Sequence, residues 1–150
     1  MSHNTDISKL DDLITTTIDS VRGYEHSADH ADAGRYVDFF HAMAHERSDV
    51  IDALAAQSRA LGGTPAEYGS AAGTIHRRVE DLRIALGGGD EAILSEIERG
   101  EDYLKEEFER ALTDANISAS TQTVMRQCYE SVLRGHDRVR QLRDQFAAAH

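Results

Sequence analysis

The sequence contains no tryptophan, one proline and one cysteine in 150 residues. A single cysteine, Cys128, cannot form a disulfide within the chain, which favours a reducing compartment. No apolar run reaches the roughly 18–20 residues that a membrane-spanning helix needs. The start, "MSHNTDISKLDD", is polar and acidic and does not resemble a signal peptide. We therefore expect a cytoplasmic protein with no membrane partner.

Basic residues are also scarce. Only 16 lysines and arginines oppose 27 aspartates and glutamates, so the net charge is −11 with histidine neutral. A basic surface that could bind phosphates is missing, which argues against nucleic acid as a partner. The length suits one domain, residues 1–150, and we expect an ordered core over about residues 7–147.

Apolar residues recur at helical spacing in four long segments. The pattern predicts helices over about residues 7–32, 35–61, 90–113 and 120–148. Links of about three and six residues join the first helix to the second and the third to the fourth, so each pair should be an antiparallel hairpin. The sequence therefore predicts an all-α protein.

The connection between the two hairpins is much longer and contains "TIHRRVEDLRIAL", which predicts a short helix of its own. Two hairpins joined by one long crossover form a ferritin-like four-helix bundle. The alternative is an up-down-up-down bundle with a decorated middle loop.

One carboxylate interrupts the apolar face of the third predicted helix. Glu101 lies between Ile97 and Leu104, at the spacing that the core positions of this helix follow. Burying a carboxylate is costly unless a proton, a cation or a metal ion compensates its charge. We therefore expect Glu101 to have a partner inside the bundle.

Each of the other three helices also carries one metal-capable side chain on its predicted inner face. These side chains are Glu25, Glu46 and His136. Ferritin-like di-metal sites cluster carboxylates and histidines from four helices around iron or manganese. The candidate metal ligands are therefore Glu101, His136, Glu46 and Glu25.

This ligand set is incomplete. A full site takes one glutamate from each of two helices and Glu-x-x-His from each of the other two. Here Asp49 stands where the histidine after Glu46 is expected, and Leu133 stands three residues before His136.

The four candidate ligands can be ranked by their height along the bundle axis. With 1.5 Å of rise per residue, Glu101 and His136 should differ in height by about 4–5 Å, and Glu25 and Glu46 by about 7 Å. Glu101 and His136 are therefore the best predicted pair, Glu46 the next member and Glu25 the weakest.

A second interpretation needs no metal. A buried Glu–His pair can be part of a hydrogen-bonded structural network that fixes the register of the helices. Tyr24 and Tyr129 would complete such a network, and Arg47 or Arg99 would neutralise a carboxylate from the edge of the stripe.

Two further histidine pairs have the i, i+4 spacing that can hold a surface metal ion. They are His26 with His30 and His41 with His45, and they lie among aspartates and serines beside the apolar stripes. We expect them to belong to solvated faces.

Several segments together resemble a known family, the bacterial ferritin-like four-helix-bundle proteins that are known only as a domain of unknown function. These segments are "LDDLITTTIDSVRGYEHSADHA", "LGGTPAEYGSAAGTIHRRVEDLRIALGGGDEAIL", "ERGEDYLKEEFERAL" and "HDRVRQLRD". The resemblance implies a ferritin-like bundle that forms a homodimer, and it implies no reaction. Members of the family often carry a glutamate where this chain has "TTT" at 15–17. Rubrerythrin and bacterioferritin are more distantly similar.

Three hypotheses of function follow. The first is a non-catalytic ferritin-like protein that acts in stress tolerance through self-association or a protein partner. The alternative is an iron- or manganese-binding protein that reacts with oxygen or peroxide through Glu46, Glu101 and His136. The third is a bundle that holds a hydrophobic ligand between its helices.

Overall fold

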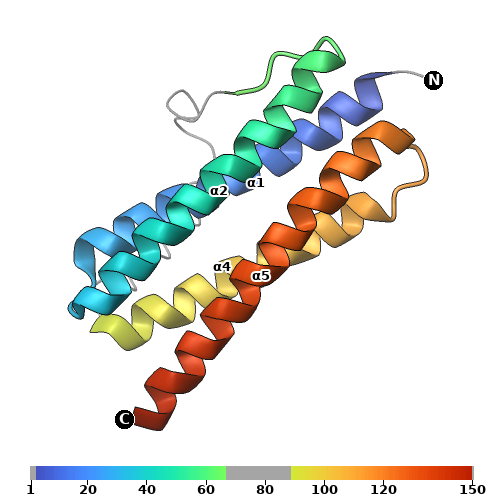
Figure 1. Ribbon diagram of the computed structural model, residues 1–150. Coiled ribbons are helices and arrows are strands. Elements are labelled where there is room, and N and C mark those ends of the chain that lie inside the picture. Colours follow the sequence, from blue (N-terminus) through green and yellow to red (C-terminus); the bar gives the residue numbers. More distant parts are fainter. Residues whose placement is uncertain (1–2, 67–88, 150) are drawn as a thin grey trace.

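The computed structural model describes residues 3–66 and 89–149. These residues form four α-helices and no strand (Figure 1): α1 (His3–His30), α2 (Gly34–Ala60), α4 (Gly89–Leu112) and α5 (Ala119–Ala149). Each predicted helix is present, and its ends agree with the prediction to within about four residues. The all-α prediction is therefore confirmed. The short helix predicted in "TIHRRVEDLRIAL" lies outside the described residues.

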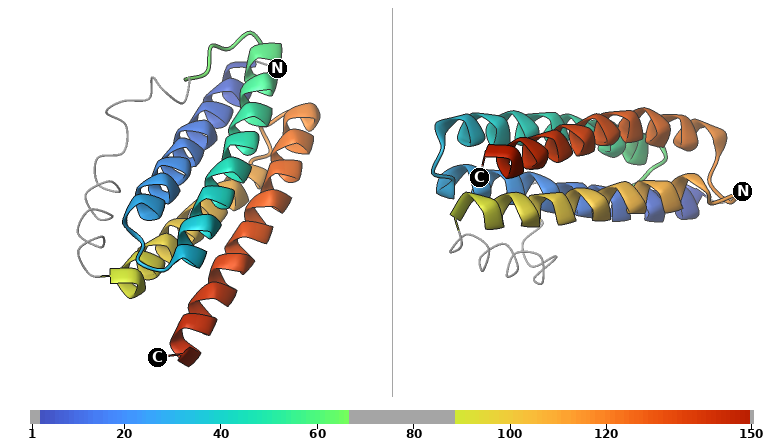
Figure 2. Two further views of the ribbon diagram at one scale, coloured as in Figure 1. Left: turned by 60° about the vertical axis from the view of Figure 1, so that its left-hand side comes forward. Right: turned by 90° about the horizontal axis from the view of Figure 1, so that it is seen from below.

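The four helices form two antiparallel hairpins, α1 with α2 and α4 with α5, which lie side by side. α1 contacts α4 and α2 contacts α5, and the right-hand view in Figure 2 shows α1 with α4 in one layer and α2 with α5 in the other. α2 and α4 run in the same direction along the bundle (Figure 1). None of the four described helices combines the length and apolar character that crossing a bilayer requires.

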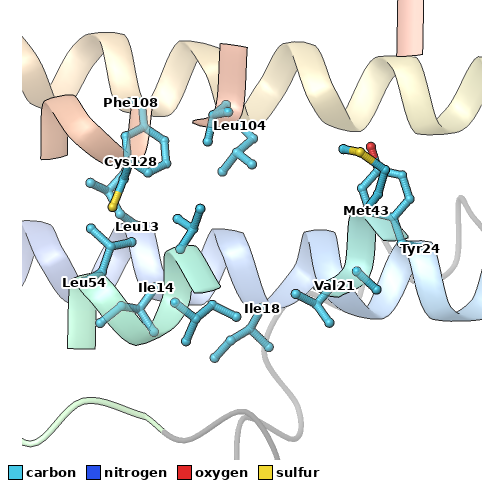
Figure 3. Packing of buried hydrophobic residues seen from close by; sticks show 14 of the residues in the cluster. Leu13, Ile14, Ile18, Val21, Tyr24, Met43, Leu54, Leu104, Phe108 and Cys128 are labelled. Carbon is cyan, nitrogen blue, oxygen red and sulfur yellow. The ribbon is translucent and has the colours of Figure 1, made fainter. Parts of the chain in front are cut away.

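Apolar residues spaced along each helix meet in one core. On α1 the apolar stripe from Leu10 through Ile14 and Ile18 to Val21 is buried throughout. Figure 3 shows Ile14, Ile18 and Val21 beside Leu54 of α2, while Leu13 lies on the side of Leu104 and Phe108 of α4, and all belong to one core. Burial of leucine and isoleucine side chains stabilises a fold by roughly 1.5–3 kcal/mol each relative to full exposure.

At one end of the bundle, a carboxylate at the start of α4 joins the two hairpins. The Asp90 side chain accepts hydrogen bonds from the backbone N–H groups of Asp32, at 2.8 Å, and Ala33, at 3.2 Å. Both donors lie in the turn between α1 and α2. Asp90 therefore holds the start of α4 against the turn of the other hairpin.

At the opposite end, Asp6 joins the two hairpins. It lies in the first turns of α1 and is fully buried. Its carboxylate accepts hydrogen bonds from the backbone N–H of Ser118, at 3.1 Å, and from the Thr121 hydroxyl, at 2.8 Å. The Ser118 hydroxyl also donates to it. Ser118 directly precedes α5, so the charge of Asp6 lies at the positive end of the α5 dipole.

These contacts make the stability contribution of Asp6 depend on pH. Burial alone would raise the pKa of Asp6, but the hydrogen bonds from Ser118 and Thr121 outweigh it and the pKa is lowered. A carboxylate with a lowered pKa contributes stability above its unfolded pKa of about 3.9, and this contribution is lost as the pH falls through the folded pKa.

We predict that Asp6→Asn lowers the free energy of unfolding at pH 7 by about 1.5–3 kcal/mol, the range for hydrogen bonds to charged groups. The difference from wild type should shrink below about pH 4, because Asp6 itself becomes protonated there. Urea unfolding at pH 7 and at pH 3 measures the loss of stability and its dependence on pH. Asp12→Asn, at an exposed position of the same helix, is the matched control. An Asp6→Asn effect that stays constant with pH would contradict the prediction.

Candidate functional site

The charge of Glu101 is compensated by a buried arginine. Glu101 on α4 is 2% exposed and Arg47 on α2 is 1% exposed. The guanidinium binds both carboxylate oxygens, with Nη2–Oε1 at 2.6 Å and Nη1–Oε2 at 2.7 Å. This two-bond geometry is the strong form of an arginine–carboxylate pair. The partner expected for Glu101 inside the bundle is therefore Arg47.

Two residues of α1 complete the network. The buried Tyr24 hydroxyl donates to Glu101 Oε2 at 2.6 Å, and Arg47 Nη1 donates to Ser20 Oγ at 2.9 Å. The Arg47 guanidinium carbon also lies 5.9 Å from the centre of the Tyr24 ring. Ser20, Tyr24, Arg47 and Glu101, which we call the central network, thus link three helices.

The fourth helix contributes a glycine. A Cβ atom on Gly135 of α5 would lie 2.4 Å from Arg47 Nη2 and 2.7 Å from Met43 Cε, closer than real contacts allow. Glycine inside a helix costs about 1 kcal/mol relative to alanine. Space for the guanidinium explains why this position of α5 nevertheless has no side chain.

The pKa shifts show which groups of the network carry charge. Burial, and then the nearby Glu101 charge, raise the pKa of Tyr24 well above its ordinary value, so the phenol stays neutral. Burial alone would lower the pKa of Arg47, but the charge of Glu101 outweighs it and the pKa is raised. The network therefore holds one fixed cation and a neutral phenol donor around the Glu101 carboxylate.

His136 is buried on the inner side of α5, as predicted, but it does not contact Glu101. Its Nε2 lies 2.6 Å from Oδ1 of the half-exposed Asp102. Its buried Nδ1 has no hydrogen-bond partner among the described residues, and Asp137 Oδ1 lies 3.7 Å away. The prediction of a direct Glu101–His136 pair is therefore wrong, because the seam of α4 with α5 presents Asp102 to His136.

Glu46 and Glu25 were assigned to inner faces, and the structure corrects both. Glu46 is 30% exposed and pairs with Arg138 of α5, while its neighbour Arg47 takes the inner position. Glu25 is exposed, and its neighbour Tyr24 is buried instead. On each helix the inner position belongs to the residue next to the predicted glutamate, and neighbouring residues of a helix point about 100° apart.

The four predicted ligands consequently do not converge. Within residues 3–66 and 89–149, no group of three histidine, cysteine, aspartate or glutamate side chains is placed to share a metal ion. Glu101, His136 and Glu46 each contact a different partner, namely Arg47, Asp102 and Arg138. That these residues and Glu25 bind a metal remains a prediction.

The structural network that the sequence suggested is partly formed. Tyr24 and Arg47 both contact Glu101, whereas Arg99 pairs with Glu96 on the surface and Tyr129 donates to Glu109. Ser20, Asp102 and Gly135 were missed. The one sequence signal that could have revealed any of them was the glycine itself, which lies between Val132 and Val139 inside the apolar stripe of α5.

The histidine pairs lie on solvated faces, as expected. His26, His30, His41 and His45 are all exposed. The Nδ1 atom of His30 is 2.9 Å from the carbonyl oxygen of His26, a hydrogen bond within α1.

We predict that Gly135→Ala destabilises the protein by about 1–3 kcal/mol, the usual cost of overpacking, even though alanine is the better helix former. The added methyl group would displace the Arg47 guanidinium, which two bonds to Glu101 hold in place. Thermal and urea unfolding measure the change. Gly34→Ala is the matched control, since nothing lies within 4 Å of that Cβ. Equal or higher stability of Gly135→Ala would show that Arg47 is not tightly held.

We also predict strong energetic coupling between Arg47 and Glu101. Arg47→Met leaves a buried carboxylate unpaired and should cost about 3–5 kcal/mol, as should Glu101→Leu, which leaves a buried cation. The double variant should cost much less than the sum of the two, which a double-mutant cycle in urea measures.

The surface pair Glu46–Arg138 provides the control for this cycle. Its side chains are 30% and 43% exposed, so its coupling energy should stay below about 1 kcal/mol. Additive effects of Arg47→Met and Glu101→Leu would mean that the central ion pair is not coupled.

Comparison with known proteins places the chain in a family. No curated protein matches it. Residues 5–114 match the family described as "Domain of unknown function (DUF2383)". This match takes in α1, α2 and α4, which supply all four residues of the central network. The chain therefore belongs to the DUF2383 family, a domain of unknown function.

Proposed function

We propose that this chain is a non-catalytic, ferritin-like bundle protein in which an arginine supplies the positive charge that metal ions supply in di-metal bundles. The bidentate contact between Arg47 and Glu101 carries the proposal. It compensates the one fully buried carboxylate at the centre of the described bundle without a metal ion. The protein would then act by associating with itself or with a protein partner.

The directions of the helices support the ferritin-like part of the proposal. The start of α4 lies beside the turn between α1 and α2, because Asp90 binds the backbone of Asp32 and Ala33. The end of α2 lies beside the start of α5, because Gln57 donates to Thr121 at 3.0 Å. α2 and α4 therefore run in the same direction, as in bundles whose two hairpins are joined by a long crossover.

A metal ion does not fit the central network as it stands. Glu101 accepts hydrogen bonds from Arg47 and Tyr24 through both of its oxygens. A metal bound there would have to displace the guanidinium and leave a buried, unpaired cation beside it, which is costly.

The metal-binding alternative has one observation in its favour. Histidines that bind metals commonly donate their other ring N–H to a carboxylate. His136 has this arrangement, with Asp102 at its Nε2 and no hydrogen-bond partner for Nδ1 among the described residues. An iron or manganese site that uses Glu46, Glu101 and His136 for redox chemistry would require these three side chains to move together.

Metal content separates the two functions. We expect protein expressed with iron and manganese, and purified without chelator, to contain no stoichiometric metal by mass spectrometry. One or two metal ions per chain, lost in Glu101→Gln and in His136→Gln, would overturn the proposal. The double variants His26→Ala/His30→Ala and His41→Ala/His45→Ala identify metal held only by one of the two exposed histidine pairs.

The same preparations test self-association. The resemblance to bacterial ferritin-like proteins implies a homodimer, so light scattering should give twice the chain mass of 16.6 kDa. A monomer at all concentrations would exclude self-association and leave only a protein partner.

A further inference from the structure

The connection between the two hairpins leaves α2 and enters α4 at opposite ends of α1. After α2 the chain turns towards the start of α1, where a Cβ atom on Gly63 would lie 3.1 Å from Cγ2 of Ile7. The right-hand view of Figure 2 shows this light-green stretch leading from the α2–α5 layer towards the α1–α4 layer. At the other end Asp90, the second residue of α4, binds the turn that follows α1. Residues 67–88 therefore have to connect one end of α1 to the other.

The length of this connection suits a path beside α1. Ile7 and Asp32 are 25 residues apart, which corresponds to about 38 Å along α1. The 22 residues from 67 to 88 would reach about 50 Å if 13 of them are helical, as the sequence predicts, and the other nine are extended. A path over the α2–α5 layer would have to cross the bundle twice, although both ends already lie at α1. We therefore expect the connection to follow the α1–α4 face.

The α1–α4 face has a groove with apolar side chains in its wall. A pocket of about 60 Å³ lies in this groove, and its lining residues fall between 16 and 26 on α1 and between 96 and 104 on α4. These stretches are about 12–15 Å long. Ile97 and Leu104 belong to the lining, as does Tyr103, which is 39% exposed. The groove can therefore accept a short apolar stripe from another segment.

The sequence of the connection contains a stripe of this kind. Ile75, Val79, Leu82 and Leu86 lie at i, i+4, i+7 and i+11 within "TIHRRVEDLRIAL", which is the spacing of one helix face. Such a stripe would be about 16 Å long, close to the length of the pocket lining. A helix of about 13 residues is marginal in water and depends on packing of its apolar face. The segment also has three arginines against two acidic residues, whereas the whole chain carries −11, so charge favours its contact with the bundle.

We propose that residues 74–86 dock in the groove between α1 and α4, with their apolar stripe against Ile97 and Leu104. Tyr24 and Glu101 line the same pocket, so the docked segment covers the central network on the α1–α4 side. The occupant of the groove is thus a part of the same chain. The inference concerns packing alone and applies with or without a metal ion, so it does not rest on the proposed function.

Nuclear Overhauser effects (NOEs) between side chains test the docking in the wild-type protein. The methyl groups of Val79 and Leu82 should show NOEs to Ile97 and to the ring of Tyr103. NOEs from these methyl groups to side chains of α2 and α5 instead, or none to the bundle, would overturn the proposal. A mixture of isotope-labelled and unlabelled chains identifies NOEs between chains. If the contacts with Ile97 and Tyr103 arise only between chains, a second copy occupies the groove and the proposal is wrong.

Two aspartate substitutions give a matched comparison. Leu82 lies on the apolar stripe, whereas Ile84, two residues later, would point about 200° away from Leu82 on a helix. Leu82→Asp would bring a charge into the apolar groove, so the NOEs from Val79 to Ile97 should be lost and the backbone NMR signals of residues 96–104 should shift. Ile84→Asp should leave both unchanged. Equal effects of the two variants, or no effect of Leu82→Asp, would contradict the docking. If Leu82→Asp does not fold, the wild-type NOEs decide.

Discussion

The ion pair between Arg47 and Glu101 is the contact around which the centre of the bundle is arranged. Its two bonds require the guanidinium and the carboxylate to be coplanar and within 2.7 Å of each other. Tyr24 and Ser20 then have to face the pair from α1, and α5 has to leave space at Gly135. Buried ion pairs contribute little net stability, because desolvation offsets their attraction. The effect of this one is to determine which face each helix turns inward.

Local sequence patterns predicted the helices well because the signals for a helix are local. Apolar spacing, the glycines after α2 and the polar links between helices lie within a few residues of the feature they determine. The burial of Glu101 could be predicted for the same reason, since its apolar neighbours Ile97 and Leu104 are themselves buried. His136 was placed inward by the same argument, and it is buried.

Partners across helices could not be predicted in this way. Phe39 and Phe40 gave α2 two nearly equivalent apolar faces, one containing Glu46 and the other Arg47. A pattern within α2 favours neither, because an arginine is buried only where a second helix supplies a carboxylate. Likewise, the axial levels of Glu101 and His136 were compared without their rotation about the helix axes, so Asp102 was overlooked as the residue that meets His136.

Polar contacts join the two hairpins at three levels: Asp90 at one end, the central network in the middle and Asp6 at the other end. Apolar contacts are non-directional and would tolerate one hairpin sliding along the other. A slip of one helical turn, about 5.4 Å, would remove all three carboxylates from their donors, and Asp6 and Glu101 would then be buried without partners. These contacts therefore select one register. The same contacts occupy both oxygens of Glu101, so this carboxylate serves the register of the two hairpins.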